Sequence, residues 1–206
     1  MYWGGFIFTG MKKRLWLLML CFGLMNVALA QKDSLANDEH GKYIYYHVVN
    51  VGKDNADVLM ARAIVFFDMP ANKASFKLTS KDANTKTIDG TGFFMVASTT
   101  SLTKHDDGKI NFKLRIEIKD GKYRYWLTDF VFIPYYKDRY NNLVPKPGTE
   151  IPAEELNKKI DNKGAAHYLD ECAAFGIKFG TRFKQQMENA PVKTSNGKKV
   201  VVTEKW

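Results

Sequence analysis

The sequence predicts one α+β domain, in which about five antiparallel strands form a sheet and two helices pack on one face. Two observations carry this prediction. Apolar and polar residues alternate through residues 110–119, and two other segments repeat apolar residues at three- and four-residue steps. The predicted order is strand, helix, four strands, helix, which is typical of an antiparallel sheet with its helices on one side. A length of 206 residues, 45% of them hydrophobic, suits a single core.

The first strand and helix are predicted over residues 43–70. Residues 43–51 are rich in β-branched and aromatic side chains, and Gly52 ends that strand. Asp54 or Asn55 can cap the following helix, because a short side-chain oxygen accepts hydrogen bonds from first-turn N–H groups. Pro70 is expected to close the helix. Its apolar stripe consists of Ala56, Leu59, Met60, Ala63, Phe66 and Phe67.

Four more strands are predicted in the middle of the chain. Residues 75–81 and 87–98 are two β-rich runs separated by a turn-prone segment. The last two strands form a hairpin around Asp120-Gly121, a dipeptide that favours a two-residue turn.

The hairpin register predicts which side chains share a face. On the outer side, away from the helices, Glu117 opposes Arg124 and Arg115 opposes Trp126, and such cross-strand pairs are worth about 0.2–1 kcal/mol each. The alternation fails at Asp129, which this register would point inward, so we expect a β-bulge or the end of pairing there. The inner pairs are Ile118 with Tyr123, Ile116 with Tyr125, and Leu114 with Leu127.

The C-terminal part is predicted as a loop, a long helix and a tail. Residues 134–152 contain four prolines and predict a long loop. Residues 189–206 are basic and polar and predict a flexible tail. The stripe of the intervening helix, which places Cys172 among apolar neighbours, is Ala165, Leu169, Cys172, Gly176, Phe179, Phe183 and Met187.

The N-terminus predicts export to the periplasm or cell envelope. Residues 12–14 are basic, residues 15–27 are apolar, and residues 28–30 (ALA) form a small-x-small cleavage site. We therefore assign residues 1–30 to an upstream extension plus a cleavable signal peptide, with translation starting at Met11, and residues 31–42 to a flexible leader. The apolar run is shorter than the ~20 residues that span a bilayer, so the mature chain is not expected to cross a membrane. Cleavage leaves 28 Lys and Arg against 22 Asp and Glu, a net charge of +6.

The domain, residues 43–188, resembles a family of exported bacterial proteins described as a domain of unknown function with a TBP-like fold. The resemblance covers residues 56–157, about half of the mature chain, and lies in structural motifs. It implies a TBP-like α+β fold and implies no catalytic or ligand-binding residues. The motifs are residues 59–63 (LMARA), 116–130 (IEIKDGKYRYWLTDF), 143–145 (LVP) and 152–156 (PAEEL).

The sequence predicts no catalytic residues, no metal site and no cofactor. The four histidines are scattered, whereas metal sites need ligands that converge with close spacing. No Gly-x-Ser-x-Gly elbow occurs. Cys172 is the only cysteine left after signal cleavage, so the mature chain cannot form an internal disulfide.

These features favour a non-enzymatic binding or assembly module that acts through the outer sheet face or the proline-rich loop. Its partner would be an envelope protein, a peptide or a glycan, and export argues against nucleic acid. One alternative is a hydrolase that uses clustered carboxylates, drawn from Asp106, Asp107, Asp129, Glu154 and Glu155. Another is a binder of anionic envelope polymers, whose binding would collapse with salt. The candidate binding residues of the outer face are Arg115, Glu117, Arg124, Trp126, Phe93 and Met95.

Overall fold

A computed structural model describes residues 35–97 and 106–189. The predicted signal peptide, the start of the predicted leader and the predicted tail from residue 190 onward lie outside the described residues. The strands are β1 (Ala36–Asn37), β2 (Tyr43–Asn50), β3 (Phe76–Asp82), β4 (Thr87–Ala97), β5 (Asp106–Lys119), β6 (Lys122–Lys137), β7 (Leu143–Pro145) and β8 (Ile151–Pro152). The helices are α2 (Ala56–Asp68), α3 (Pro70–Lys73), the 3-10 turn η1 (Ala153–Glu155), α4 (Leu156–Lys159) and α5 (Asn162–Asn189).

The strands form one antiparallel sheet in the order β1-β2-β6-β5-β4-β3, and β7 and β8 pair with the end of β6. The five long strands and two main helices confirm the predicted fold class, while the three short strands raise the number above five. Of these, β1 lies in the predicted leader, and β7 and β8 lie in the predicted loop. Each of them pairs with the backbone of a longer strand. This pairing satisfies N–H and C=O groups that are costly to bury unpaired. Sequence periodicity does not detect strands of two or three residues.

The β5–β6 hairpin has the predicted register. Ile116 pairs with Tyr125, Glu117 with Arg124 and Arg115 with Trp126. Gly121 in the turn has φ +71°, a left-handed conformation that favours glycine. The turn also holds the start of α2, because the Asp120 carboxylate accepts a hydrogen bond from the Ala56 N–H at 2.8 Å.

The expected bulge in β6 is confirmed. The pairing between β5 and β6 shifts register between Asn111 and Lys113, and Asp129 has φ +51° at that point. The extra residue keeps Phe130 in the core and turns the Asp129 carboxylate to the outer side, where it pairs with Lys113. The bulge therefore moves a carboxylate that would otherwise be buried beside Phe112.

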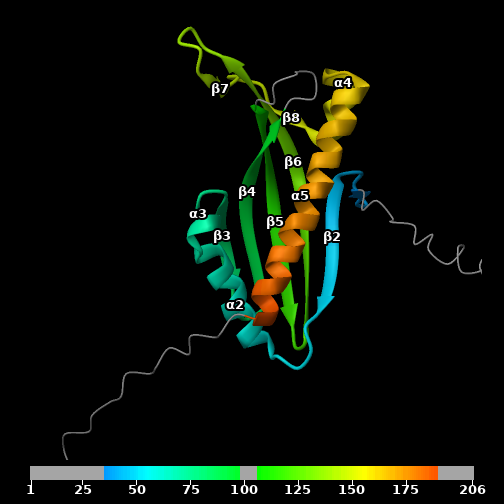
Figure 1. The fold of residues 1–206 in the computed structure, drawn as a ribbon. Coiled ribbons are helices and arrows are strands. Elements are labelled where there is room, and N and C mark those ends of the chain that lie inside the picture. Colours follow the sequence, from blue (N-terminus) through cyan, green and yellow to red (C-terminus); the bar gives the residue numbers. More distant parts are fainter. Residues whose placement is uncertain (1–34, 98–105, 190–206) are drawn as a thin grey trace, which may run out of the picture. The chain divides into compact units, whose positions relative to one another are not determined.

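Both main helices cover the inner face of the sheet (Figure 1). Asn55 caps α2, since its side chain accepts a hydrogen bond from the Val58 N–H. In Figure 1, α5 crosses the sheet diagonally beside α2, and the Phe66 and Phe183 rings of the two helices meet edge to face at 5.1 Å. Cys172 is buried in this core, as the helical stripe predicts.

Candidate functional site

The outer face of the sheet, opposite α2 and α5, is left open by these two helices (Figure 1). The strand register arranges its side chains in rows that cross β2, β6, β5 and β4. One row runs from Tyr46 to Trp126, Arg115 and Asp89. Among the described residues, the side chains of this row stay exposed or half-buried. The face is therefore accessible over several strands.

Four of the candidate residues form one cluster near the hairpin turn, on the outer face. The Arg124 guanidinium contacts Glu117 at 2.5 Å, and its central carbon lies 5.6 Å from the centre of the Trp126 ring. Arg115 lies 3.5 Å from the Asp89 carboxylate and 3.7 Å from Glu117. Two arginines and two carboxylates therefore cluster beside a tryptophan, and their charges balance.

The other two candidates, Phe93 and Met95, share the outer face but lie farther along β4. Phe93 pairs with Asn111 and Met95 with Lys109, two rows or more from the Arg115 cluster. The Lys109 ammonium lies 5.4 Å from the centre of the Phe93 ring. The structure thus places all six candidates on one face, in two separate groups.

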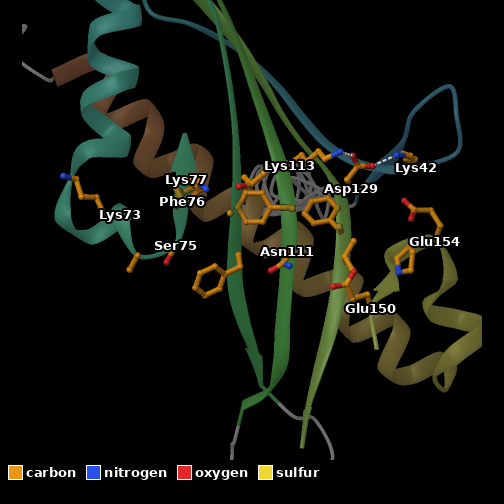
Figure 2. Close-up of a pocket in the computed structure, with 18 residues that line it drawn as sticks. Lys42, Lys73, Ser75, Phe76, Lys77, Asn111, Lys113, Asp129, Glu150 and Glu154 are labelled. Atoms are coloured by element: carbon orange, nitrogen blue, oxygen red, sulfur yellow. Dashed lines mark hydrogen bonds and ion pairs between the residues drawn. The ribbon is translucent and has the colours of Figure 1, made fainter. Parts of the chain in front are cut away.

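Phe93 belongs to a groove of about 810 Å³ that crosses the sheet from α3 and β3 to β8 and η1 (Figure 2). Val131, Asn111 and Phe93 form one row of its floor, and the Phe93 N–H donates to the Ser75 carbonyl on the far side. The neighbouring row runs through Lys113, Thr91 and Lys77. The floor therefore combines apolar surface with hydroxyl, amide and ammonium groups.

An ion triplet at the bulge lines one part of this groove. The Asp129 carboxylate pairs with the ammonium groups of Lys42 and Lys113, the latter at 2.9 Å. The hydrogen bond from Lys42, followed by that from Lys113, holds the pKa of Asp129 below its ordinary value. Asp129 therefore stays ionised and fixes both lysines at the groove.

The two ends of the groove carry opposite charges. Figure 2 shows Lys73 and Lys77 on the side of α3 and β3, and Glu150 and Glu154 on the opposite side, where Lys42 is neutralised by Asp129. Glu154 also accepts a hydrogen bond from the Tyr43 N–H at 2.9 Å, which ties it to β2. A ligand that lies along the groove would meet ammonium groups at one end and carboxylates at the other.

Sequence reasoning missed most of the groove. Lys42 falls in the predicted leader and Glu150 in the predicted loop, so neither could be placed on the sheet. Lys77 and Tyr46 could have been found, because alternation within their strands puts them on the outer side. The break in alternation at Asp129 was the one signal that pointed to this site.

The described residues contain no group of three or more His, Cys, Asp or Glu side chains that could hold a metal ion. Burial raises the pKa of the Cys172 thiol, so this cysteine is not a poised thiolate nucleophile. Within the same part of the chain, no helix has the length and apolar character needed to span a bilayer.

Fold and site define the class of protein: an α+β domain with helices on one face of an antiparallel sheet and the other face exposed. Residues 45–133 match the family model described as "Domain of unknown function (DUF4468) with TBP-like fold". This segment runs from β2 into β6, and the resemblance expected from the sequence is confirmed.

Two solved structures have a similar fold. One is a TBP-like protein from Parabacteroides distasonis, 18% identical, with a TM-score of 0.56, covering 76% of this chain and 99% of that one. The other is a DUF4468 family protein from Bacteroides ovatus, 16% identical, with a TM-score of 0.56, covering 80% of this chain and 95% of that one. No curated protein matches the sequence. At these identities the likeness establishes the TBP-like fold alone.

Proposed function

We propose that the protein is an exported, non-enzymatic binding module of the cell envelope that holds a segment of a partner protein on its outer sheet face. One observation carries the proposal: no described helix covers this face, and it is hollowed into a groove of about 810 Å³. The N-terminal pattern of basic, apolar and small residues supports export.

The chemistry of the face suits a peptide segment. Trp126 and Tyr46 supply aromatic surface beside arginines, a combination enriched at protein interfaces. In the groove, backbone amides of a bound segment could pair with Asn111 and Thr91, while its charged side chains meet Lys77 or Glu150 at the two ends. Mixed charges and apolar groups are what a polypeptide offers and a uniform polyanion lacks.

Two further observations favour peptide binding over the alternatives. The outer face interleaves Asp89 and Glu117 with its arginines, whereas surfaces that bind nucleic acid or polyanions are dominated by positive charge. A carboxylate hydrolase needs an acid with a raised pKa, yet hydrogen bonds from two lysines lower the pKa of Asp129 in the groove. That carboxyl is therefore ionised at neutral pH and suits binding better than proton donation.

Pull-down from envelope extract, followed by cross-linking from the outer face, tests the proposal. The double variant Arg115→Ala, Trp126→Ala removes the centre of the four-residue cluster near the hairpin turn. We expect capture of the partner to fall at least tenfold, because central aromatic and arginine side chains dominate binding energy. A variant that carries a photo-reactive residue in place of Asn111, in the floor of the groove, should cross-link to the same partner.

The matched control carries Lys178→Ala with Lys184→Ala on the exposed side of α5, which should leave capture unchanged. Thermal unfolding of each variant separates loss of binding from loss of fold. Unchanged capture by the Arg115/Trp126 variant would contradict the proposal. Capture that disappears in moderate salt and is blocked by polyphosphate would favour the polymer-binding alternative instead.

A further inference from the structure

The end of β6 and strand β7 form a two-stranded ribbon that extends beyond the main sheet. Gly108 of β5 pairs with Pro134. Beyond Pro134, β7 is the only described strand that pairs with β6, through Tyr135–Pro145, Tyr136–Val144 and Lys137–Leu143. Figure 1 shows this ribbon projecting past the ends of β4 and β5. None of the paired residues of this ribbon is buried by the described part of the chain, and an isolated hairpin is marginally stable in water.

The ribbon nevertheless carries large apolar and aromatic side chains in solvent. Tyr136 is 44% exposed, Tyr140 is 70% exposed and Leu143 is 37% exposed. They lie within eight residues of chain at a protruding tip, and clustered exposed apolar groups mark interaction surfaces. Their position is not explained by packing within the described domain.

The turn that presents these side chains is ordered by its own hydrogen bonds. The Asp138 carboxylate accepts from the N–H groups of Tyr140 and Asn142 at 2.8 and 2.9 Å. Asn141 completes the turn with φ +65°, which asparagine tolerates better than most residues. Because the tip is already ordered, binding through it loses little conformational entropy.

Cations surround the aromatic tip. Lys137, Arg139 and Lys146 are exposed, and none of them pairs with a carboxylate in the described part of the chain. The Arg139 guanidinium lies 4.9 Å from the centre of the Tyr140 ring. A hollow of about 940 Å³ at the base of the ribbon is lined by Lys159, Lys146 and Tyr135, and by one carboxylate, Glu150. The one acid in the turn, Asp138, is engaged by backbone donors.

We propose that the β6–β7 ribbon docks the domain on the surface of an anionic lipid bilayer. Tyrosine is suited to the interface, because its ring is apolar and its hydroxyl is polar. Lysine and arginine are attracted to anionic head groups. In this arrangement Tyr136, Tyr140 and Leu143 enter the interfacial layer, and the cations of the ribbon and its base contact the phosphates.

A bilayer explains the ribbon better than a soluble polyanion does. A polyanion would use the cations alone and leave the tyrosines and Leu143 in water, whereas a membrane surface uses both. The inference is independent of the proposed function, because these side chains belong to the ribbon and not to the outer-face clusters.

Co-sedimentation of the full chain with vesicles tests the proposal. The probes are phosphatidylcholine vesicles with and without about 30% phosphatidylglycerol, and binding is expected to be much stronger with the anionic lipid. Replacing Lys137, Arg139 and Lys146 by Ala should weaken binding about 100-fold, since each cation near the surface contributes about fivefold. Tyr136→Ser with Tyr140→Ser should weaken it roughly tenfold. The N-terminal apolar segment is the same in all variants, so differences report on the ribbon.

A label placed on the ribbon gives a direct reading. Asn142→Cys, in a chain with Cys21→Ser, is labelled with a polarity-sensitive dye, while buried Cys172 stays unlabelled. The dye emission should shift to the blue with anionic vesicles. Lys178→Ala with Lys184→Ala on α5 is the matched control and should bind as the parent does. Equal binding by the cation variant, or an unchanged dye signal on bound protein, would overturn the proposal. If only the cation variant loses binding and polyphosphate competes fully with the vesicles, the ribbon binds a soluble polyanion. That result would also overturn the proposal.

Discussion

Replacement of Asp129 by Asn tests whether the ion triplet at the bulge contributes to stability. Asparagine has nearly the same shape and tolerates the positive φ of this position, so the substitution removes the charge and leaves the backbone unstrained. The Asp129 side chain is 24% exposed, and its partners Lys42 and Lys113 are 49% and 67% exposed. Partly exposed pairs contribute about 0–1 kcal/mol each, so Asp129→Asn should lower the free energy of unfolding by about 1 kcal/mol at neutral pH.

The loss should depend on pH in a defined direction. The pKa of Asp129 lies below its ordinary value of 3.8 in the folded protein, so the unfolded chain binds the proton more tightly. The ion pairs therefore stabilise the fold above the unfolded pKa, and this contribution disappears as the pH falls through the lower, folded pKa. The difference between the two proteins should be constant down to about pH 4 and shrink below it.

Urea unfolding followed by circular dichroism at several pH values measures this difference. Asp89→Asn is the matched control, because its carboxylate pairs with Arg115 at 3.5 Å on the same face, and it should change stability by less than about 0.5 kcal/mol. A difference that persists unchanged far below pH 4, or an Asp129→Asn protein as stable as the parent, would refute the reasoning.

Three further predictions concern the core. A Cβ at Gly176 would lie 2.4 Å from the buried Tyr45 ring, so Gly176→Ala should lower the melting temperature. This is the opposite of the usual effect, because glycine to alanine inside a helix ordinarily stabilises by about 1 kcal/mol. A higher melting temperature would show that the ring can move. The Tyr123 hydroxyl is buried with no hydrogen-bond partner among the described residues. Tyr123→Phe should therefore leave the free energy of unfolding, measured with urea, unchanged or raise it by up to about 1–3 kcal/mol. A clear loss of stability would reveal a hydrogen-bond partner. Phe183 is fully buried against Phe66, and Phe183→Ala should cost about 3–5 kcal/mol by the same assay; a loss below about 1 kcal/mol would mean that the helices pack differently.

The sequence predicted the fold where periodicity is long and regular. The alternation through β5 and β6 was enough to place Ile116 opposite Tyr125 and Arg115 opposite Trp126, because a period of two and a two-residue turn leave one register. The same register pointed to the bulge at Asp129 as a break in the pattern. The start of β5 was missed, since Asp106 and Gly108 have turn-like composition and form strand through pairing with β4, which β6 supplements at Gly108.

The candidate site was predicted in part. The alternation of side chains along each strand predicted that Phe93, Arg115 and Trp126 lie on the outer face, and the strand register agrees. The groove could not be predicted, because its ends come from residues far apart in the chain, Lys73 on α3 and Glu154 on η1. The β6–β7 ribbon could not be predicted either, because the four prolines of this segment are typical of an irregular loop.

The sequence alone determined the compartment expected for the protein, the two helices with their buried stripes, and the two faces of the central hairpin. These properties depend on residues that are neighbours in the chain, and their patterns can be read directly. Only the tertiary structure decided that Lys42 and Lys113 share Asp129, that opposite charges stand at the two ends of one groove, and that Tyr136 and Tyr140 stay exposed. Each of these depends on chain segments meeting across the sheet or ending beyond it, which local patterns do not encode.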